Sequence, residues 1–217
     1  MTNGPRIAVA ASPRNSRHNL EASSKFQEAA NSLKGRFPGL LAAPIQIGEA
    51  TFSAVLTDAT QGFDFATALA EAVWPMQLRV AMLTVGHQVG AAADSQAHSR
   101  SLALLGEAIR DRAPFRFLVS GRKEMEVQLA EAAALLHSTL MHEWTQTRAE
   151  AVRAYRSLGR QRDAAQKLGI TQQAVSQMLR GARLKEMSGL ENAMRDWFTE
   201  EARPGLWPLR NFEKEVG

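Results

Sequence analysis

The pattern of hydrophobic residues changes once along the chain, near residue 122, and this change limits the folds that the chain can adopt. Before residue 122, short apolar runs alternate with segments of helical spacing, which predicts elements in the order β-α-β(β)-α-β-α-β. After it, apolar residues recur only at spacings of three and four, and no strand signal remains. The sequence therefore predicts an α+β fold, with helices packed on an N-terminal sheet and an all-helical part behind it. The expected strands are residues 6–11, 44–56 (a strand pair or a bent strand), 78–89 and 115–119, and the expected helices are 20–37, 63–73 and 95–112.

A long helical pattern follows residue 122, and neither proline nor glycine interrupts it before Gly159. Its length exceeds that of an average globular helix. We interpret it as a connecting or dimer-forming helix, or as two helices separated by a kink; an ordinary packed helix fits equally well. The residues on its apolar face are Met125, Leu129, Ala132, Leu136, Leu140 and Trp144.

The segment from Gln161 to Arg180, QRDAAQKLGITQQAVSQMLR, has the features of two short helices joined by a tight turn. Ala165 is the small residue that a close helix crossing requires, and Gly169, four residues later, tolerates the positive φ of a turn. Thr171 is a good N-cap for the second helix. These features predict a helix-turn-helix, locked together by Ala164, Leu168, Ile170, Val175 and Met178.

The second helix of this hairpin would present an uncharged polar surface with one arginine. Glutamine can bind adenine through two hydrogen bonds, arginine can bind guanine in the same way, and serine can contact either a base or a phosphate. We therefore expect this helix to read double-stranded DNA in the major groove. The expected base contacts are Thr171, Gln172, Gln173, Ser176, Gln177 and Arg180.

Basic residues are concentrated around the same segment. Between Arg148 and Lys185, nine basic residues face two acidic ones, a net charge of +7, so the rest of the chain carries −3 of the total +4. Such a run can be merely a solvated face, and the hairpin can merely pack or bind a protein partner. Next to a base-reading helix, these side chains are better explained as phosphate contacts. The expected phosphate contacts are Arg156, Arg160, Arg162, Lys167, Arg183 and Lys185.

The string LGITQQAVSQ resembles the core of the helix-turn-helix in sigma factors and many repressors. The resemblance covers about 20 to 40 residues and implies a mode of DNA binding, not a target. It implies that residues 144–158 form the supporting helix of a three-helix unit. Residues 184–198 carry a further apolar face, which would close the domain or pair two subunits.

The first 120 residues resemble the SatD-like family. Asn15, Ser16 and Arg17 follow the first strand as in the family's opening motif, and residues 48–53 stand where the family has a second, acidic turn. Residues 78–86 and 97–100 correspond to a later strand and helix. The resemblance implies a sheet with helices on one face, related to the palm domains of nucleotidyl cyclases.

Palm domains use acidic side chains to hold magnesium against phosphates. In this sequence Ser12 occupies the first acidic position, and Glu49 is the one carboxylate left in the second motif, with Ala50 beside it. One carboxylate cannot hold two metal ions, so we do not expect an enzyme. The alternative is a nucleotide-acting enzyme of palm-like fold targeted to DNA, for which the available carboxylates are scattered: Glu49, Asp58, Asp64 and Asp94.

The N-terminal part is then interpreted as a sensor, interaction or dimerisation domain. Its polar cluster of Asn15, Ser16 and Arg17 follows a strand, where α/β folds often bind ligands, so a small-molecule or protein effector is a candidate partner; a solvent-facing loop is the alternative. His87, His98 and Asp94 have no metal-ligand spacing. We expect neither a metal nor another cofactor.

The sequence predicts a sensor or dimerisation domain (1–121), a connecting helix (122–143), a helix-turn-helix domain (144–202) and a tail (203–217). Cysteine is absent, no apolar run approaches the roughly 18 residues of a membrane span, and no secretory signal is recognised at the start, so a cytoplasmic protein without membrane contact is expected. The function predicted is a sequence-specific, homodimeric DNA-binding regulator of transcription. A third interpretation is an assembly protein that binds a partner such as RNA polymerase.

Overall fold

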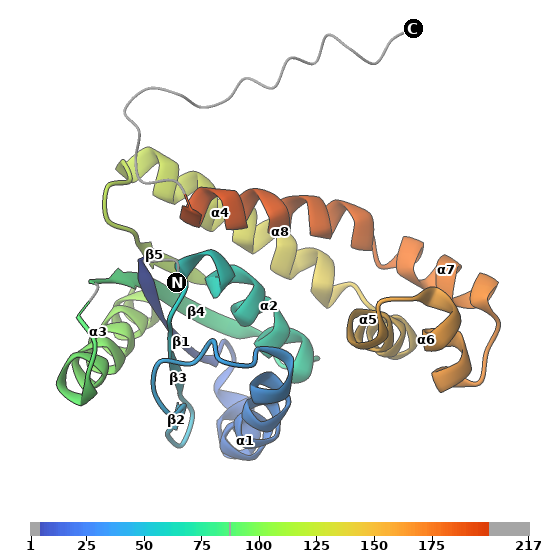
Figure 1. Ribbon diagram of the computed structural model, residues 1–217, viewed down its shortest axis with the longest axis horizontal. Helices are drawn as coiled ribbons and strands as arrows, with labels where there is room; N and C mark the ends of the chain where they lie inside the picture. The colour runs from blue at the N-terminus through green and yellow to red at the C-terminus, as the bar shows by residue number, and fades with distance from the viewer. Residues whose placement is uncertain (1–4, 87, 200–217) are drawn as a thin grey trace, which may run out of the picture.

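The computed structural model describes residues 5–86 and 88–199. It confirms the alternation of strands and helices expected in the first 121 residues, and the protein is α+β with a five-stranded mixed sheet (Figure 1). Elements there are β1 (Arg6–Pro13), α1 (Asn19–Arg36), β2 (Gln46–Ile47), β3 (Phe52–Leu56), α2 (Gly62–Ala72), β4 (Leu78–Val85), α3 (Ala91–Arg110) and β5 (Phe115–Leu118).

The sheet has the strand order β2-β3-β1-β4-β5, with β1 at its centre. β1 runs antiparallel to both β3 and β4, whereas β4 and β5 are parallel. Val9, in the middle of β1, lies opposite Ala54 on one side and Met82 on the other. All eight residues of β1 are buried, which is typical of a strand in a sheet that is covered on both faces.

Helices pack on both faces of the sheet. Successive side chains of a strand point to opposite faces, so Ile7 and Val9 enter a core shared with α1 and α2, whereas Ala8 and Ala10 face α3. The resemblance to the SatD-like family implies helices on one face, and this expectation is wrong. The physical reason is that β1 is apolar at alternate positions on both sides, and the small alanines leave room for α3.

The described chain beyond residue 122 is helical, as expected. The predicted long helix is divided in two at residues 143–145. Thr145 begins the second helix, its Oγ1 accepting a hydrogen bond from the Arg148 N–H (3.4 Å). The buried Trp144 holds the break in place by donating from Nε1 to the Ala182 carbonyl (3.0 Å). The helices are α4 (Glu124–His142), α5 (Gln146–Leu158), α6 (Gln161–Leu168), α7 (Gln172–Gly181) and α8 (Leu184–Thr199).

A second hydrophobic core joins α5, α6, α7 and the beginning of α8, and α8 connects it to the sheet. Leu184 and Met187 of α8 lie in this helical core, but Met194 and Phe198, further along α8, lie in the core beneath the sheet. Figure 1 shows α4 and α8 as one layer along the sheet domain, with α5, α6 and α7 at its end. The predicted tail, residues 203–217, lies outside the described residues.

Candidate nucleic-acid interface

The turn between α6 and α7 has the local geometry that the sequence predicts. Gly169 adopts a left-handed conformation (φ 68°), and its N–H bonds back to the end of α6. The Thr171 Oγ1 accepts a hydrogen bond from the Ala174 N–H (3.1 Å), so Thr171 is the N-cap of α7. The small Ala165 is buried where the two helices meet. Glycine and threonine at these two positions therefore set where α6 ends and α7 begins.

The packing of the two helices agrees with the sequence in most positions. Ala164 and Val175 are buried, and Leu168 and Met178 are half-buried against the same core. Ile170 is 37 % exposed, so the prediction that it locks the hairpin is wrong. Leu179 is buried instead, because it lies four residues after Val175 on the inner face of α7.

The outer face of α7 carries the predicted base-contacting side chains. Gln172, Gln173, Gln177 and Arg180 are exposed, while Ser176 is half-buried at the edge. Within the described residues, the exposed glutamine and arginine side chains have no hydrogen-bond partner. Thr171 is also exposed, and its hydroxyl keeps a hydrogen to donate after capping the helix. The surface is therefore polar and uncharged except for one arginine, and its glutamine and arginine side chains are unpaired within the described ranges.

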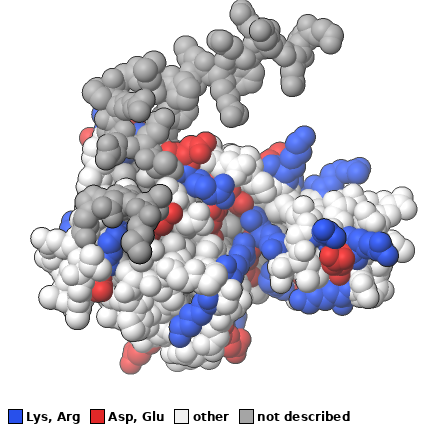
Figure 2. All heavy atoms as spheres, viewed as in Figure 1, with Lys and Arg blue, Asp and Glu red and all other residues white. Residues whose placement is uncertain are grey.

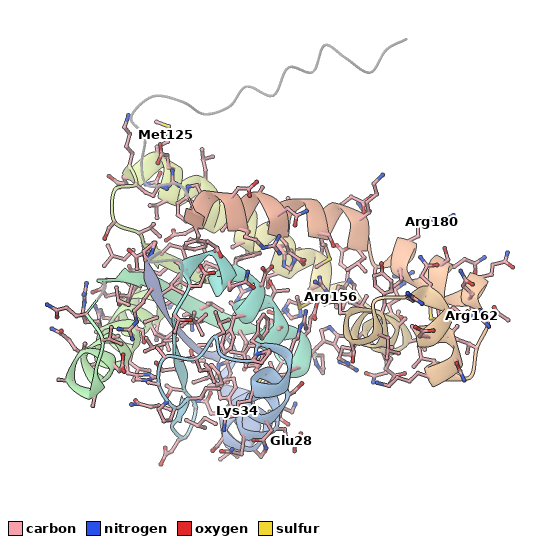
Figure 3. The ribbon with its side chains drawn as sticks, in the orientation of Figure 1. Glu28, Lys34, Met125, Arg156, Arg162 and Arg180 are labelled. Atoms are coloured by element: carbon pink, nitrogen blue, oxygen red, sulfur yellow. The ribbon has the colours of Figure 1, made fainter. Side chains whose placement is uncertain are left out.

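Five predicted phosphate contacts surround this face. Each is exposed, and none forms an ion pair with an acid in the part of the chain that the structure describes. Figure 2 shows Lys and Arg side chains gathered over the end of the molecule that α6 and α7 form, and Figure 3 places Arg162 and Arg180 together at that end. The five are Arg160, Arg162, Lys167, Arg183 and Lys185.

Arg156 does not lie on this surface, contrary to its predicted role as a phosphate contact. Its guanidinium forms two hydrogen bonds with the Glu191 carboxylate (2.6 and 3.0 Å). Its Nε also pairs with the Glu71 carboxylate (2.7 Å), and only 15 % of the side chain is exposed. The sequence gives a weak signal for this position, since Arg156 falls on the helix face of the buried Ala149 and Val152. Arg156 is therefore a buried link between α5, α2 and α8.

The pKa values of the two carboxylates that pair with Arg156 shift in opposite directions. Burial raises the pKa of Glu71 above its ordinary value, although Arg156 and Arg36 oppose the shift. Burial also acts to raise the pKa of Glu191, but hydrogen bonds from His137 (2.8 Å) and Arg156 outweigh it and lower the pKa to about 2. Glu191 is therefore ionised throughout the physiological range.

The predicted ligand cluster Asn15, Ser16 and Arg17 lies exposed just after β1. The Asn15 Oδ1 accepts a hydrogen bond from the Arg17 N–H (3.0 Å) and caps a single 3₁₀ turn formed by residues 16–18. This bond gives Asn15 a local structural role. These residues line neither the pocket beside Phe63 and His137 nor the pocket beside Arg6 and Arg100.

The carboxylates of the first 121 residues do not converge. Asp58 caps a 3₁₀ turn, Asp64 binds Arg195 (2.7 Å), and Asp94 pairs with Arg6. Glu49 is exposed, and the buried Ser12 stands at the end of β1. Among the residues that the structure describes, no three His, Asp or Glu side chains form a metal-binding group.

Of the two histidines considered as metal ligands, His98 is buried and its Nδ1 is hydrogen-bonded to the Ser53 hydroxyl (2.8 Å). His87 lies outside the described residues.

Comparison of the chain with protein-family models, curated proteins and solved structures finds no match in any of the three. No helix in the described ranges combines the length and apolar character of a membrane span.

Proposed function

We propose that this protein binds double-stranded DNA in a sequence-specific manner and regulates transcription. In this proposal α6 and α7 form a helix-turn-helix, and α7 enters the major groove. The observation that carries it is the outer face of α7, where Gln172, Gln173, Gln177 and Arg180 are exposed and have no described partner within the protein. Such side chains lose no internal hydrogen bond when they bind to base edges.

The charge around α7 supports the same proposal. Lys167 lies in the last turn of α6, just before α7, and Arg183 and Lys185 lie just after α7, so cations lie at both ends of the base-reading surface. Arg160 precedes α6 as its N-cap, and Arg162 lies in its first turn. Contacts of this kind to phosphates set the position and orientation of a protein on DNA but carry no sequence information. They also make binding strongly dependent on salt.

For the first 121 residues we propose a sensor or dimerisation role in a homodimer, with an effector at Asn15–Arg17 as a further candidate. The palm-like relationship rests on the motif resemblance alone. Three of the four carboxylates that an enzyme would need already have partners: Asp58 caps a turn, Asp64 binds Arg195 and Asp94 binds Arg6. Among the residues that the structure describes, the nucleotide-acting alternative therefore has no supporting arrangement of carboxylates.

The proposal is tested by selecting bound sequences from a random duplex pool with the full-length protein, then measuring affinity by fluorescence anisotropy. Gln173→Ala is expected to cost about 1–3 kcal/mol on the selected site, because one bidentate base contact is lost, and to leave binding to unrelated DNA unchanged. Gln27→Ala, an exposed glutamine on α1, is the matched control and should bind like the native protein.

The phosphate contacts are tested separately by the salt dependence of binding. Arg160→Ala should weaken binding to every duplex and reduce the slope of log K against log salt by about 0.9. Arg110→Ala, an exposed arginine on α3, should leave that slope unchanged. If the full-length protein binds no duplex at low salt, the proposal is refuted. Association with RNA polymerase that does not require DNA would support the assembly-protein interpretation.

A further inference from the structure

A polar pocket lies at the edge of the sheet where β1 begins and β4 ends, between these strands and α3. Arg6 and Val85 are paired across the two strands at this edge, and both line the pocket. Its volume is about 120 Å³. Its polar lining residues are two arginines and two glutamines: Arg6, Gln88, Gln96 and Arg100. We use the name Arg6 pocket for this space, which none of the candidate DNA-contacting residues lines.

Arg6 is a buried side chain whose guanidinium is only partly satisfied. Only 7 % of the side chain is exposed. Its Nη1 donates a hydrogen bond to the Gln88 carbonyl, and its Nη2 donates one to the Asp94 carboxylate. The Nε–H is also buried, but it has no hydrogen-bond partner among the described residues. Proteins pair nearly all of their buried donors, so an unpaired N–H in a residue that lines a pocket points to an acceptor that binds there.

Arg100 gives the pocket an unbalanced positive charge. The charge of Arg6 is balanced by Asp94, with which it forms a buried ion pair. Arg100 is exposed and forms no ion pair within the described ranges. It shares one face of α3 with Ala93 and Ala97, which also line the pocket, because residues three and four positions apart lie on the same side of a helix. Two positive charges and one negative charge therefore leave the pocket with one positive charge.

The beginning of α3 adds to the attraction for a negative group. Gly90 precedes the helix with φ 129°, a conformation that favours glycine, and no side chain caps the helix. The first helical residues are three alanines, Ala91–Ala93, so this turn presents backbone N–H groups without long side chains around them. The positive end of the helix dipole lies at the same place. Asp94, in the same turn, is already committed to Arg6.

We propose that the Arg6 pocket binds the carboxylate group of a small molecule. Arg100 can donate two parallel hydrogen bonds to the two carboxylate oxygens, and the Arg6 Nε–H supplies a third. The single charge of a carboxylate matches the single unbalanced positive charge. A phosphate group, with a charge of about −1.5 to −2 at pH 7, would place excess negative charge near Asp94. The pocket is smaller than the roughly 300–1,000 Å³ that holds a drug-sized ligand, so the molecule is small.

The Arg6 pocket is distinct from the ligand cluster that the sequence predicts. Arg6 begins β1, whereas Asn15, Ser16 and Arg17 follow its other end, so the length of the strand separates the two places. Figure 1 shows α3 on the opposite side of the sheet from α4 and α8. The description of the bound molecule as an effector of transcription rests on the proposed function, but the binding itself does not.

Thermal denaturation of the full-length protein tests the site, with acetate as the probe. A molecule of four heavy atoms is expected to bind with a Kd of about 1 mM or weaker. Acetate at about 50 mM should raise the melting temperature above that in sodium chloride of equal ionic strength, because a ligand that binds only the folded state stabilises it. Arg100→Gln should weaken binding by about tenfold or more, since its charge-assisted hydrogen bonds are lost. Arg110→Gln, at an exposed arginine further along α3, is the matched control and should respond like the native protein.

Nuclear magnetic resonance of the ¹⁵N-labelled protein locates the bound acetate. The signal of the Arg6 Nε–H is identified as the arginine Nε–H signal that is missing from Arg6→Lys. Acetate should shift this signal in the native protein and saturate it with the Kd that the melting temperatures give. In Arg100→Gln the same shift should require about tenfold more acetate.

Three results would overturn the inference. The first is a melting temperature that acetate raises no more than chloride does. The second is an equal response of the native protein and Arg100→Gln, which indicates a general salt effect. The third is tighter binding of inorganic phosphate than of acetate, which excludes a carboxylate as the preferred ligand. Neither measurement includes DNA, so a failure here leaves the proposed function standing, and a failure of DNA binding leaves the Arg6 pocket standing.

Discussion

Replacing Arg156 by alanine removes the only guanidinium that contacts both Glu71 and Glu191 among the described residues. Both carboxylates stay buried, so the loss leaves two negative charges without their shared partner. Breaking a buried ion pair by deleting one member costs about 3–5 kcal/mol. Glu191 keeps the hydrogen bond from His137, and Glu71 keeps Arg36 at 3.3 Å, which places the expected loss near the lower end, at about 3 kcal/mol.

A loss of this size is a large part of the stability of an ordinary domain, about 5–15 kcal/mol, and is easily measured by urea denaturation. Arg160→Ala is the matched control, because Arg160 is exposed and has no described acidic partner; it should change stability by no more than about 0.5 kcal/mol. In DNA binding we expect the reverse: Arg160→Ala should be the affected variant and Arg156→Ala the unaffected one. Folded Arg156→Ala should keep the native salt slope, whereas Arg160→Ala should lower it.

Two outcomes would refute this reasoning. If Arg156→Ala unfolds at the same urea concentration as the native protein and reduces the slope of log K against log salt, Arg156 is a surface phosphate contact, as the sequence alone suggests. If Arg156→Ala is destabilised but Glu71→Gln in the same chain recovers none of the loss, the cost does not come from an unpaired carboxylate. A partial recovery is expected, because the amide of glutamine is cheaper to bury than a charge.

Three further predictions concern the pH dependence of stability, the packing at Gly181, and the stability of segment 144–199 without the rest of the chain. Because the pKa of Glu191 falls from 4.5 to about 2 on folding, its contribution of about 3 kcal/mol is present above pH 4.5 and is lost as the pH falls toward 2; Glu191→Gln should flatten the urea midpoint over that range. Gly181→Ala would place a methyl 2.9 Å from the Arg148 guanidinium, so its helix-stabilising effect should be larger in an Arg148→Ala background, as measured in a double-mutant cycle. An excised segment 144–199 should lose part of its helical content, as measured by circular dichroism, and should melt at a lower temperature than the intact chain.

The last of these predictions follows from the path of α8, which no local pattern in the sequence reveals. Met194 and Phe198 have the spacing of an amphipathic helix, and the sequence predicts that helix correctly. It does not predict that one end of the helix belongs to the α5–α7 core and the other to the core beneath the sheet. The pattern records which face is apolar but not which of two cores buries it.

Local chemistry explains why other features could be predicted. Gly169 and Thr171 act on their own backbone or on a residue three positions away, so their roles are visible in a short window of sequence. Thr145 carries the same kind of signal for the break after α4, but an apolar face that continues through residue 144 hides it. Leu179 is buried and Ile170 is exposed because of the way α7 is rotated against α5. This rotation is a property of the tertiary structure.

The basic segment shows most clearly what a charge count leaves out. Arg156 and Arg160 lie four residues apart, carry the same charge and have the same intrinsic helix propensity. What separates them is a pair of carboxylates far along the chain, Glu71 on α2 and Glu191 on α8, which are brought to α5 only by folding. Part of the segment's +7 is therefore neutralised inside the molecule. The charge available to a DNA backbone is set by the arginines and lysines that lack such partners.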